Sequence, residues 1–444
     1  MSILIKDCEW VVTQNGDRQV FRDASVLIED GLIAAIGEHL DGGTDEVIDG
    51  RRKALLPGLI NTHTHLAMSL LRGYFDDLNL DVWLRDHIWP IEARLTGEIC
   101  QAGALLGCLE MIRGGTTCFL DMYHFEKDIV STVASTGLRA FLAQGVFDVS
   151  DRWRSAYNPA WRERGGRATE SLLAEVKRID CPRVKAAVGP HTPYTCTDET
   201  LLWAKRVAER ENVLLHMHVA ETRREQAAFE SQEGKSEVEY LDSIGFLSPR
   251  LVAAHCTWMT RNEVRLVADR GVKVAHCPVS NLKLASGGVS PIVDLLESGV
   301  HVGVGTDGPA SNNSLDMFEA MKTASLLQKH QSWDASALRA QEALDMATVH
   351  GAAALGIDGE VGSIEEGKRA DLILVDLTDP NLTPVHGAAG LISNLVYSAK
   401  AHNVDTTIVD GRILMRSKQV LTIDVDEAYR RAEKALGKLG LGSG

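Results

Sequence analysis

The chain has 444 residues, of which 45% are apolar and 24% charged, proportions that are ordinary for a globular protein. Its 46 basic and 61 acidic residues leave a net charge of −15, which argues against nucleic acid or an anionic membrane as the main partner. The sequence has neither a membrane-spanning apolar run nor a signal-peptide pattern, so we expect a cytoplasmic protein.

Both ends of the chain consist of short strand-like runs separated by turns. Residues 2–13 are rich in strand-forming residues, and residues 24–37 have the pattern of a hairpin centred on residues 29–31. Residues 370–421 contain further runs of this kind. We therefore predict a small β-sandwich domain built from both termini. The predicted division is a β domain of residues 1–56 plus 358–424, a larger domain of residues 57–357, and a C-terminal helix and tail over residues 425–444.

The middle of the chain alternates apolar runs with amphipathic stretches. Thr197 and Thr260 are predicted to begin two helices, and Gly271 and Gly299 to follow the ends of two. Continuous apolar strands that alternate with helices predict a parallel sheet covered by helices. We favour an α/β fold with a (β/α)8 TIM-like barrel, and an open doubly wound sheet is the alternative. The predicted strands in this region are 184–191, 212–220, 251–256, 272–278 and 300–307.

The strongest chemical signal is LLPGLINTHTHLAM, in which His63 and His65 follow an apolar run. Alternate residues of a strand point to the same side, so both imidazoles are expected to enter one space. Two neutral imidazoles placed in this way suit a transition metal such as zinc. Chance or core packing is the alternative explanation for this motif by itself.

A second signal is HMHVAE, which contains His216, His218 and Glu221. The two histidines share a strand face, and the carboxylate follows three residues after the second. A metal ligand with a carboxylate just beyond it supplies a pair of groups that can activate water. The pattern does not decide which histidine is a ligand, and a buried strand with structural histidines is the alternative.

Two more polar side chains close predicted strands. His255 ends the run LVAAHC, and Asp307 ends VHVGVGTD before a glycine-rich loop. Taken singly, a structural histidine and a turn or capping aspartate explain them. In a barrel, however, the carboxyl ends of all strands open on one mouth. Three or four His and Asp ligands there, with one open position, are typical of a catalytic metal site.

The order of these motifs resembles the amidohydrolase superfamily in its mononuclear deaminase branch, and within it the 5'-methylthioadenosine/S-adenosylhomocysteine deaminases. The resemblance covers nearly the whole chain. Its most specific part is LRGYFDDLNLDVWLRDHIWPIE, which contains Trp83 and Glu92. The other matching segments are PGLINTHTH, RGGTTCFLDMY, GPHTPYTC, HMHVAET, AAHC, HCPVSNLKL and GTDGPASNNSLDMFEAMK.

This resemblance implies a deaminase with one divalent metal ion per subunit, zinc being favoured and iron or manganese also compatible with such ligands. The implied reaction is hydrolysis of the 6-amino group of 5'-modified adenosines, among them S-adenosylhomocysteine and 5'-methylthioadenosine, to the inosine derivative and ammonia. Glu221 is implied to carry a proton from water to ring N1, and His255 with Asp307 to orient the attacking hydroxide. The implied metal ligands are His63, His65, His218 and Asp307.

The resemblance also implies a nucleoside pocket. In it His191 reaches the base or the ribose, Trp83 lies against the nucleoside, Glu92 holds the ribose hydroxyls and Ser311 lines the wall. Ordinary helix positions are the alternative explanation for Trp83 and Glu92. A homo-oligomer is expected on the same basis, with a small-molecule nucleoside as substrate.

One position departs from the family pattern. Gln144 stands where the compared deaminases have an arginine for the carboxylate of S-adenosylhomocysteine, and Arg167 corresponds to a second such arginine. Residues 151–167 carry five arginines and two acidic residues. We predict that this segment is a loop that forms the outer wall of the pocket, so that Gln144 and Arg167 contact substrate. A solvated loop with surface ion pairs is the alternative.

Other functions fit the same ligand set. A guanine, pterin or s-triazine deaminase or a chlorohydrolase from the same branch would share the histidines and Asp307, whereas the segment with Trp83 and Glu92 favours a nucleoside. A barrel that serves only as a scaffold is the non-enzymatic alternative. Such proteins usually lose ligands or the acid–base group, and all of these residues are present here.

Overall fold

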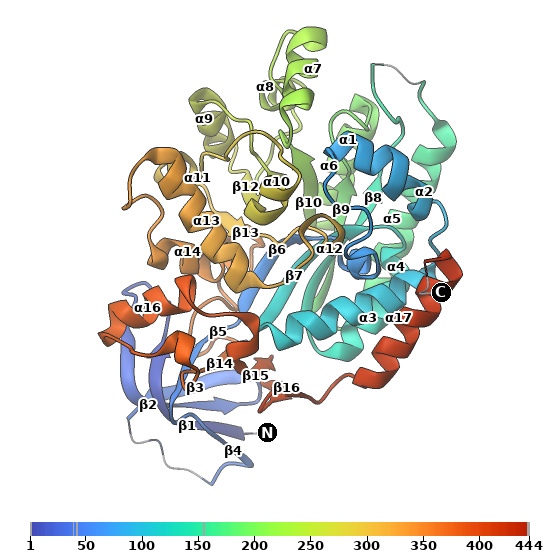
Figure 1. Ribbon diagram of the computed structural model, residues 1–444. Helices are drawn as coiled ribbons and strands as arrows, with labels where there is room; N and C mark the ends of the chain where they lie inside the picture. The colour runs from blue at the N-terminus through green and yellow to red at the C-terminus, as the bar shows by residue number, and fades with distance from the viewer. Residues whose placement is uncertain (1, 39, 41–42, 154–155, 442–444) are drawn as a thin grey trace.

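The computed structural model describes residues 2–38, 40, 43–153 and 156–441, and its centre is a barrel of eight parallel strands (Figure 1). Each strand pairs with the next in chain order, which confirms the predicted (β/α)8 architecture. The strands are β6 (Leu59–Thr64), β7 (Thr116–Tyr123), β8 (Arg139–Val146), β9 (Val184–Pro190), β10 (Leu214–Val219), β11 (Leu251–His255), β12 (Lys273–His276) and β13 (Val302–Val304).

The first and last strands meet through a few specific contacts. The amide of Asp307 donates to the carbonyl of His63 at 3.0 Å. Just below, the Asn61 side chain accepts from the backbone N–H of Thr306 at 3.1 Å and donates to its hydroxyl at 2.7 Å. These bonds bring the end of β13 beside the end of β6, so residues about 240 positions apart face one mouth.

Helices surround the barrel and follow the predicted pattern of caps. The Thr197 hydroxyl accepts from the N–H of Thr200, Thr260 forms a capping box with Glu263, and Gly271 and Gly299 have positive φ values of 65° and 78° after their helices. The main outer helices are α3 (Gly97–Arg113), α4 (Glu126–Thr136), α5 (Pro159–Ile179), α6 (Asp198–Glu211), α7 (Arg223–Glu233), α8 (Glu237–Ser243), α9 (Arg261–Asp269), α11 (Ile292–Glu297), α13 (Met317–Ser332), α14 (Ala340–Met346) and α15 (Val349–Ala354).

Shorter helical turns lie in the loops at the strand ends. They are η1 (Leu66–Leu71), α1 (Leu80–Trp83), the π turn η2 (Leu84–Ile88), α2 (Trp89–Glu92), α10 (Pro278–Lys283) and α12 (Pro309–Asn312). Four of them, η1 to α2, fill the connection between β6 and α3. This connection carries the segment that matched the deaminases most specifically.

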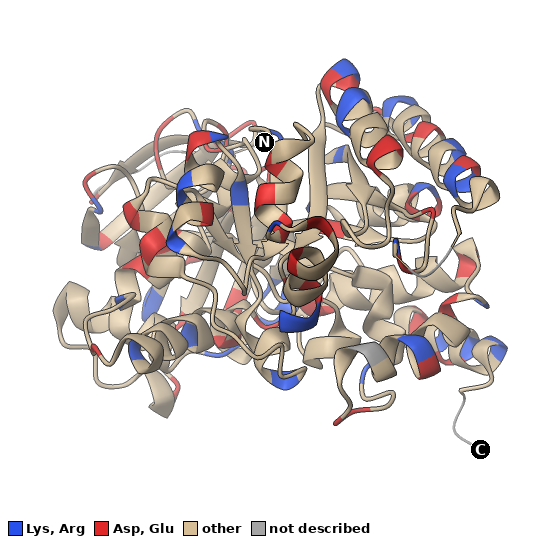
Figure 2. Ribbon diagram, turned by 90° about the horizontal axis from the view of Figure 1, so that it is seen from above, with Lys and Arg blue, Asp and Glu red and all other residues tan. Residues whose placement is uncertain are grey.

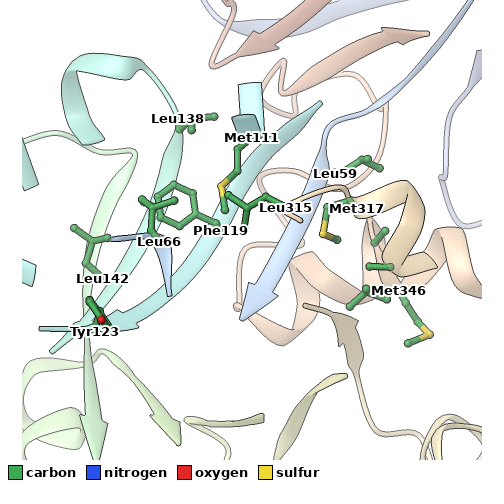
Figure 3. Packing of buried hydrophobic residues seen from close by; sticks show 14 of the residues in the cluster. Leu59, Leu66, Met111, Phe119, Tyr123, Leu138, Leu142, Leu315, Met317 and Met346 are labelled. Atoms are coloured by element: carbon green, nitrogen blue, oxygen red, sulfur yellow. The ribbon is translucent and has the colours of Figure 1, made fainter. Parts of the chain in front are cut away.

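The main apolar core lies between the barrel strands and the helices around them. Leu59 of β6 and Phe119 of β7 are fully buried, and Met111 of α3 and Leu138 beside β8 lie in the same cluster (Figure 3). Burying such side chains stabilises the fold by about 1.5–3 kcal/mol each. The core therefore fixes the strand ends, on which the polar residues of the mouth are mounted.

A second sheet joins the two termini, as predicted. Its nine strands are β1 (Ser2–Val12), β2 (Val20–Glu29), β3 (Leu32–Gly37), β4 (Glu46–Asp49), β5 (Lys53–Pro57), β14 (Leu372–Asp376), β15 (Val404–Val409), β16 (Arg412–Arg416) and β17 (Gln419–Val420). Hydrogen bonds from Ala370 to Gly31 and from Ile33 to Lys368 connect the β3 end of this sheet to the residues before β14. The sheet thus folds over a shared core that includes Ile28 and Ile408.

The C-terminal part of the chain also contributes helices to the barrel side. Residues 380–403 lie within the predicted β domain, yet they hold the helix α16 (Gly387–Tyr397), whose Tyr397 hydroxyl is 2.9 Å from that of Ser325 on α13. The helix α17 (Val425–Leu439) runs beside α3, where Lys434 and Lys438 both pair with Glu98 (Figure 1). The last residues of the predicted tail, 442–444, lie outside the described residues.

Charged residues lie mainly on the outer helices and loops, where both signs are interspersed, while the strands inside are mostly uncharged (Figure 2). Within the described part of the chain, no single helix has the length and apolar character needed to cross a membrane. The bent pair Leu84–Glu92 and Gly97–Arg113 meets that criterion by length and composition only.

A buried ion pair connects the barrel to the second sheet. Arg139, at the start of β8, donates to both carboxylate oxygens of Asp371 at 2.9 and 3.1 Å, and both residues are almost completely buried. We expect Arg139→Met to lower the free energy of unfolding by about 3 kcal/mol or more, because the buried Asp371 carboxylate loses its cationic partner and keeps only the N–H of Asp410. Thermal unfolding of the purified variant measures this. The control is Arg167→Ala, which removes an exposed ion pair; an equal shift for both variants would contradict the prediction.

Candidate metal centre and active site

Four polar side chains from the ends of three barrel strands, β6, β10 and β13, converge at the carboxyl end of the barrel. The Nε2 atoms of His63 and His65 lie 3.3 and 3.2 Å from the same oxygen, Oδ1 of Asp307. The Nε2 of His218 on β10 lies 3.3 Å from that of His65. The structure therefore brings together all four residues that the sequence suggested as metal ligands.

The second nitrogen of two of these rings is held by the backbone. Nδ1 of His65 contacts the carbonyl oxygen of Met122, and Nδ1 of His218 lies 2.9 Å from the carbonyl oxygen of His191. A carbonyl oxygen only accepts hydrogen bonds, so in each neutral ring Nδ1 carries the proton. The lone pair on Nε2 is then directed into the cluster. This arrangement is typical of histidines that bind metals.

The donor set fits a divalent cation. Nε2 of His63 is buried and, among the described residues, has no hydrogen-bond partner, although it faces the Asp307 carboxylate. Ring nitrogens of His63, His65 and His218 lie within 4.8 Å of one another. Three ring nitrogens thus gather beside one carboxylate oxygen, an arrangement that a positive charge at their centre would stabilise. Three imidazoles and one carboxylate suit zinc, and also iron or manganese.

The pKa values of these groups follow from burial and from the carboxylate. Burial lowers the pKa of His63 to about 4 and that of His218 well below its ordinary value, so both rings are neutral. Burial also disfavours a charge on His65, but the Asp307 carboxylate outweighs it and raises the pKa of His65 to about 9. Although burial opposes its charge, contacts with His63 and His65 hold the pKa of Asp307 well below its usual range. Asp307 thus keeps its negative charge, and His65 is the ring on which that carboxylate favours a positive charge.

Hydroxyl groups hold the Asp307 carboxylate in place. Ser280 and Ser311 both donate to Oδ2, the latter at 2.9 Å, and the N–H of Gly308 donates to Oδ1 at 2.7 Å. Ser311, which was predicted to line the pocket, thus orients the carboxylate directly. Ser280 was missed, although it follows a predicted strand end in HCPVSNLKL. Asp307 itself has a φ of 60°, a left-handed conformation that non-glycine residues adopt mainly at turns and functional sites.

Glu221 and His255 lie close to each other beside the cluster. Oε2 of Glu221 is 3.7 Å from Nε2 of His255, and the Glu221 side chain is largely buried just beyond β10. The amide nitrogen of Asn281 lies 3.0 Å from Nδ1 of His255, so Nδ1 accepts and Nε2 carries the proton. His255 lies close enough to His63 and Asp307 to complete a ligand set, but this tautomer makes it a hydrogen-bond donor instead. Asn281 was not predicted.

Of the predicted substrate residues, His191 lies directly beside this cluster. The ring of His191 is 5.0 Å from that of His218, and its Nδ1 is 2.9 Å from the Thr195 hydroxyl. Trp83, at the end of α1, is 4% exposed. Glu92, at the end of α2, has its Oε2 3.7 Å from Nε2 of His124.

The neighbouring His124 stabilises the negative charge of the Glu92 carboxylate. Burial opposes that charge, but His124 holds the pKa of Glu92 below its usual range. His124 was not singled out in the sequence, although it directly follows strand β7. The rule that polar residues after barrel strands reach the mouth would have found it.

The arginine-rich segment differs from its prediction. Residues 159–167 belong to the helix α5 instead of a loop, because Pro159 and the capping side chain of Asn158 begin the helix there. Arg167 is two-thirds exposed and pairs with Glu163 one turn earlier. The structure therefore does not bring Arg167 to the mouth. Arg154 lies outside the described residues.

Gln144 lies near the end of β8 and is 5% exposed. Its amide nitrogen donates to the carbonyl oxygen of Gly145 at 3.1 Å, and its oxygen accepts from the N–H of Glu126 at 3.3 Å. The side chain is thus engaged with the backbone on both sides. Its predicted contact with substrate remains a prediction.

Comparison with known proteins agrees with this geometry. The profile of the amidohydrolase family matches residues 54–414. A 5'-deoxyadenosine deaminase of Methanothermobacter thermautotrophicus is 47% identical over 419 residues, or 94% of this chain and 95% of that protein. A 5-methylthioadenosine/S-adenosylhomocysteine deaminase of Thermococcus onnurineus is 42% identical over 439 residues, or 99% and 100%. The crystal structure of an adenosine deaminase from Xanthomonas campestris with bound zinc has a TM-score of 0.92 at 35% identity, covering 99% of this chain and 98% of that one. The chain therefore belongs to the amidohydrolase family and is an aminohydrolase.

Proposed function

We propose that this aminohydrolase uses a divalent metal ion, zinc in the first place, to remove the 6-amino group of adenosines modified at the 5' position. The observation that carries the proposal is the carboxylate of Glu221 beside a cluster of four metal-binding side chains. Such a pair is what hydrolysis of an amidine needs, since water must lose a proton while the leaving nitrogen gains one.

The metal ion, held by His63, His65, His218 and Asp307, would lower the pKa of a water molecule toward neutrality. Glu221 accepts the proton that this water loses and passes it to N1 of the purine as the C6–O bond forms. His255 donates through Nε2–H and keeps the attacking oxygen aligned. Glu221 then takes the proton of the new C6 hydroxyl and delivers it to the amino group, the C6–N bond breaks, and ammonia leaves with the 6-oxo purine as the other product.

The substrate side of the mouth supports a nucleoside. Glu92 offers a carboxylate that can accept hydrogen bonds from two adjacent ribose hydroxyls, and His124 keeps it charged. The relatives whose names mention 5'-deoxyadenosine and 5-methylthioadenosine are more than 40% identical to this chain over nearly its full length. Trp83 and His191 complete the proposed nucleoside contacts.

The surroundings of Glu92 favour a short, uncharged 5' group. Three ring side chains extend outward from Glu92. The His124 ring lies 6.1 Å from that of Phe147, and the Phe147 ring lies 5.5 Å from that of Trp161 on α5. Gln144 supplies no charge where the compared deaminases have an arginine.

Two arginines of the described part of this segment are engaged elsewhere. Arg152 binds Asp198 and the Tyr240 hydroxyl, and Arg162 lies over the ring of Trp203 at 3.8 Å. These two side chains are therefore not available to pair with a carboxylate on the 5' substituent. We propose 5'-deoxyadenosine and 5'-methylthioadenosine as better substrates than S-adenosylhomocysteine.

Ammonia release from a panel of purines tests this proposal. We expect kcat/KM for 5'-deoxyadenosine and 5'-methylthioadenosine to exceed that for S-adenosylhomocysteine by about tenfold or more, since one unpaired charge in a partly buried site costs at least about 1.4 kcal/mol. Guanine and an s-triazine serve as controls for the alternative functions. Guanine as the best substrate would overturn the proposed function, and S-adenosylhomocysteine as the best substrate would overturn only the 5' preference.

A further inference from the structure

One buried histidine touches the metal centre without belonging to it. His216 on β10 is fully buried. Its Nε2 lies 2.7 Å from Nδ1 of His63, and its own Nδ1 lies 2.8 Å from the carbonyl oxygen of Val252 on β11. The two histidine rings therefore form a chain of hydrogen-bond contacts that runs from the Val252 carbonyl through His216 to His63 in the metal-binding cluster.

This series allows one arrangement of protons. The Val252 carbonyl can only accept, so Nδ1 of His216 carries the proton of that ring. The ring is fully buried, which disfavours a charge on it, so it is neutral and its Nε2 has a free lone pair. That lone pair must receive the hydrogen of His63, which places the proton of His63 on Nδ1. Nε2 of His63 is then unprotonated and faces Asp307.

The other ligand histidines reach the same tautomer in a different way. His65 and His218 each donate to a backbone carbonyl, which no substitution removes. His63 instead points its Nδ1 into the barrel, where main-chain groups are used by the sheet and a side chain must serve as acceptor. His63 is therefore the one of these three whose tautomer depends on a replaceable residue.

We propose that His216 is a positioning residue that fixes the tautomer and orientation of His63 and thereby strengthens metal binding. This inference rests on the metal site of the proposed function. Without an acceptor at position 216, His63 can place its proton on Nε2 and lose its ligand lone pair. Removing an outer partner of this kind typically weakens metal affinity about 10–100-fold.

Zinc affinity of three variants tests the inference, measured by competition with a chromophoric chelator. His216→Met keeps the bulk of the ring but removes the acceptor, and we expect the zinc dissociation constant to rise about 10–100-fold. His216→Gln can place its side-chain oxygen near the former Nε2, and we expect most of the affinity to be retained. The control is His276→Met, because His276 is equally buried but neither of its ring nitrogens has a hydrogen-bond partner within the part of the chain that the structure describes. Thermal unfolding of the zinc-free proteins checks that each variant folds.

The possible results distinguish a failure of the proposed metal site from a failure of the proposed role of His216. Wild-type protein that binds no zinc would overturn the metal site itself. Wild-type affinity in His216→Met, or equal losses in the Met and Gln variants, would overturn the role of His216 alone. Should His216→Met fail to fold, the wild-type protein labelled with 15N-histidine decides the question. The inference requires a proton on Nδ1 of His63 that is shared with a second histidine, and a proton on Nε2 would refute it.

Discussion

Replacing Glu221 by Gln is expected to lower kcat for deamination by about 10³-fold or more, while the bound zinc remains stoichiometric. Gln has the size and hydrogen-bonding capacity of Glu but cannot take a proton from water, and general acid–base groups contribute about 10²–10⁴-fold to rates. Glu221 is 3.7 Å from His255 and is not among the clustered ligand residues, so its replacement leaves the metal centre intact. Ammonia release under saturating 5'-deoxyadenosine, together with metal analysis, measures both quantities.

Glu225 provides a matched control for this substitution. Its carboxylate accepts the N–H groups of Glu221 and Thr222, and burial together with the nearby Glu221 raises its pKa to about 8. Glu225→Gln keeps an acceptor oxygen there, so we expect kcat to stay within about tenfold of wild type. If Glu221→Gln also stayed within tenfold, Glu221 would not be the group that moves the proton.

Replacing Asp307 by Ala is expected to remove zinc on dialysis and to lower kcat by about 10³-fold or more, because a metal ion supplies several kcal/mol of transition-state stabilisation. Asp307 is the anionic member of the ligand cluster, and both His63 and His65 face its Oδ1. Without it, three neutral imidazoles must hold a doubly charged ion. Metal content and ammonia release, with and without added zinc, measure the effect.

Ser311→Ala is the control for Asp307, because it removes one of the two hydroxyls on Oδ2 and leaves the donor from Ser280. We expect it to retain zinc and to weaken the zinc affinity by no more than about tenfold. Retention of stoichiometric zinc by Asp307→Ala would contradict the assigned ligand set.

The barrel and the positions of its polar residues could be predicted because both rest on local patterns. Apolar runs that alternate with capped helices predict parallel strands, and the predicted strand ends at 251–256 and 184–191 agree closely with β11 and β9. His63, His65, His255 and Asp307 each follow such a run, and the carboxyl ends of barrel strands share one mouth. No pairing between distant residues had to be known for that conclusion.

Local patterns failed where two positions look alike in sequence. His216 and His218 lie on the same face of one strand, so alternation treats them equally. In the fold, Nε2 of His218 lies 3.3 Å from Nε2 of His65. His216 lies two residues earlier on the strand, and its Nε2 contacts Nδ1 of His63, the ring nitrogen that faces away from Asp307. The residues that hold the site in place were also missed, since Asn281 and Ser280 act through bonds that span 26 and 27 positions in the chain.

Sequence patterns were sufficient to predict the fold class and the common location of the predicted site residues, because strand periodicity and strand order are properties of short segments. The three-dimensional structure was needed to show which nitrogen of each histidine faces the centre, that Arg167 turns outward on α5, and that His216 supports His63. Those properties depend on the partner of each atom, and every such partner comes from a different strand or helix.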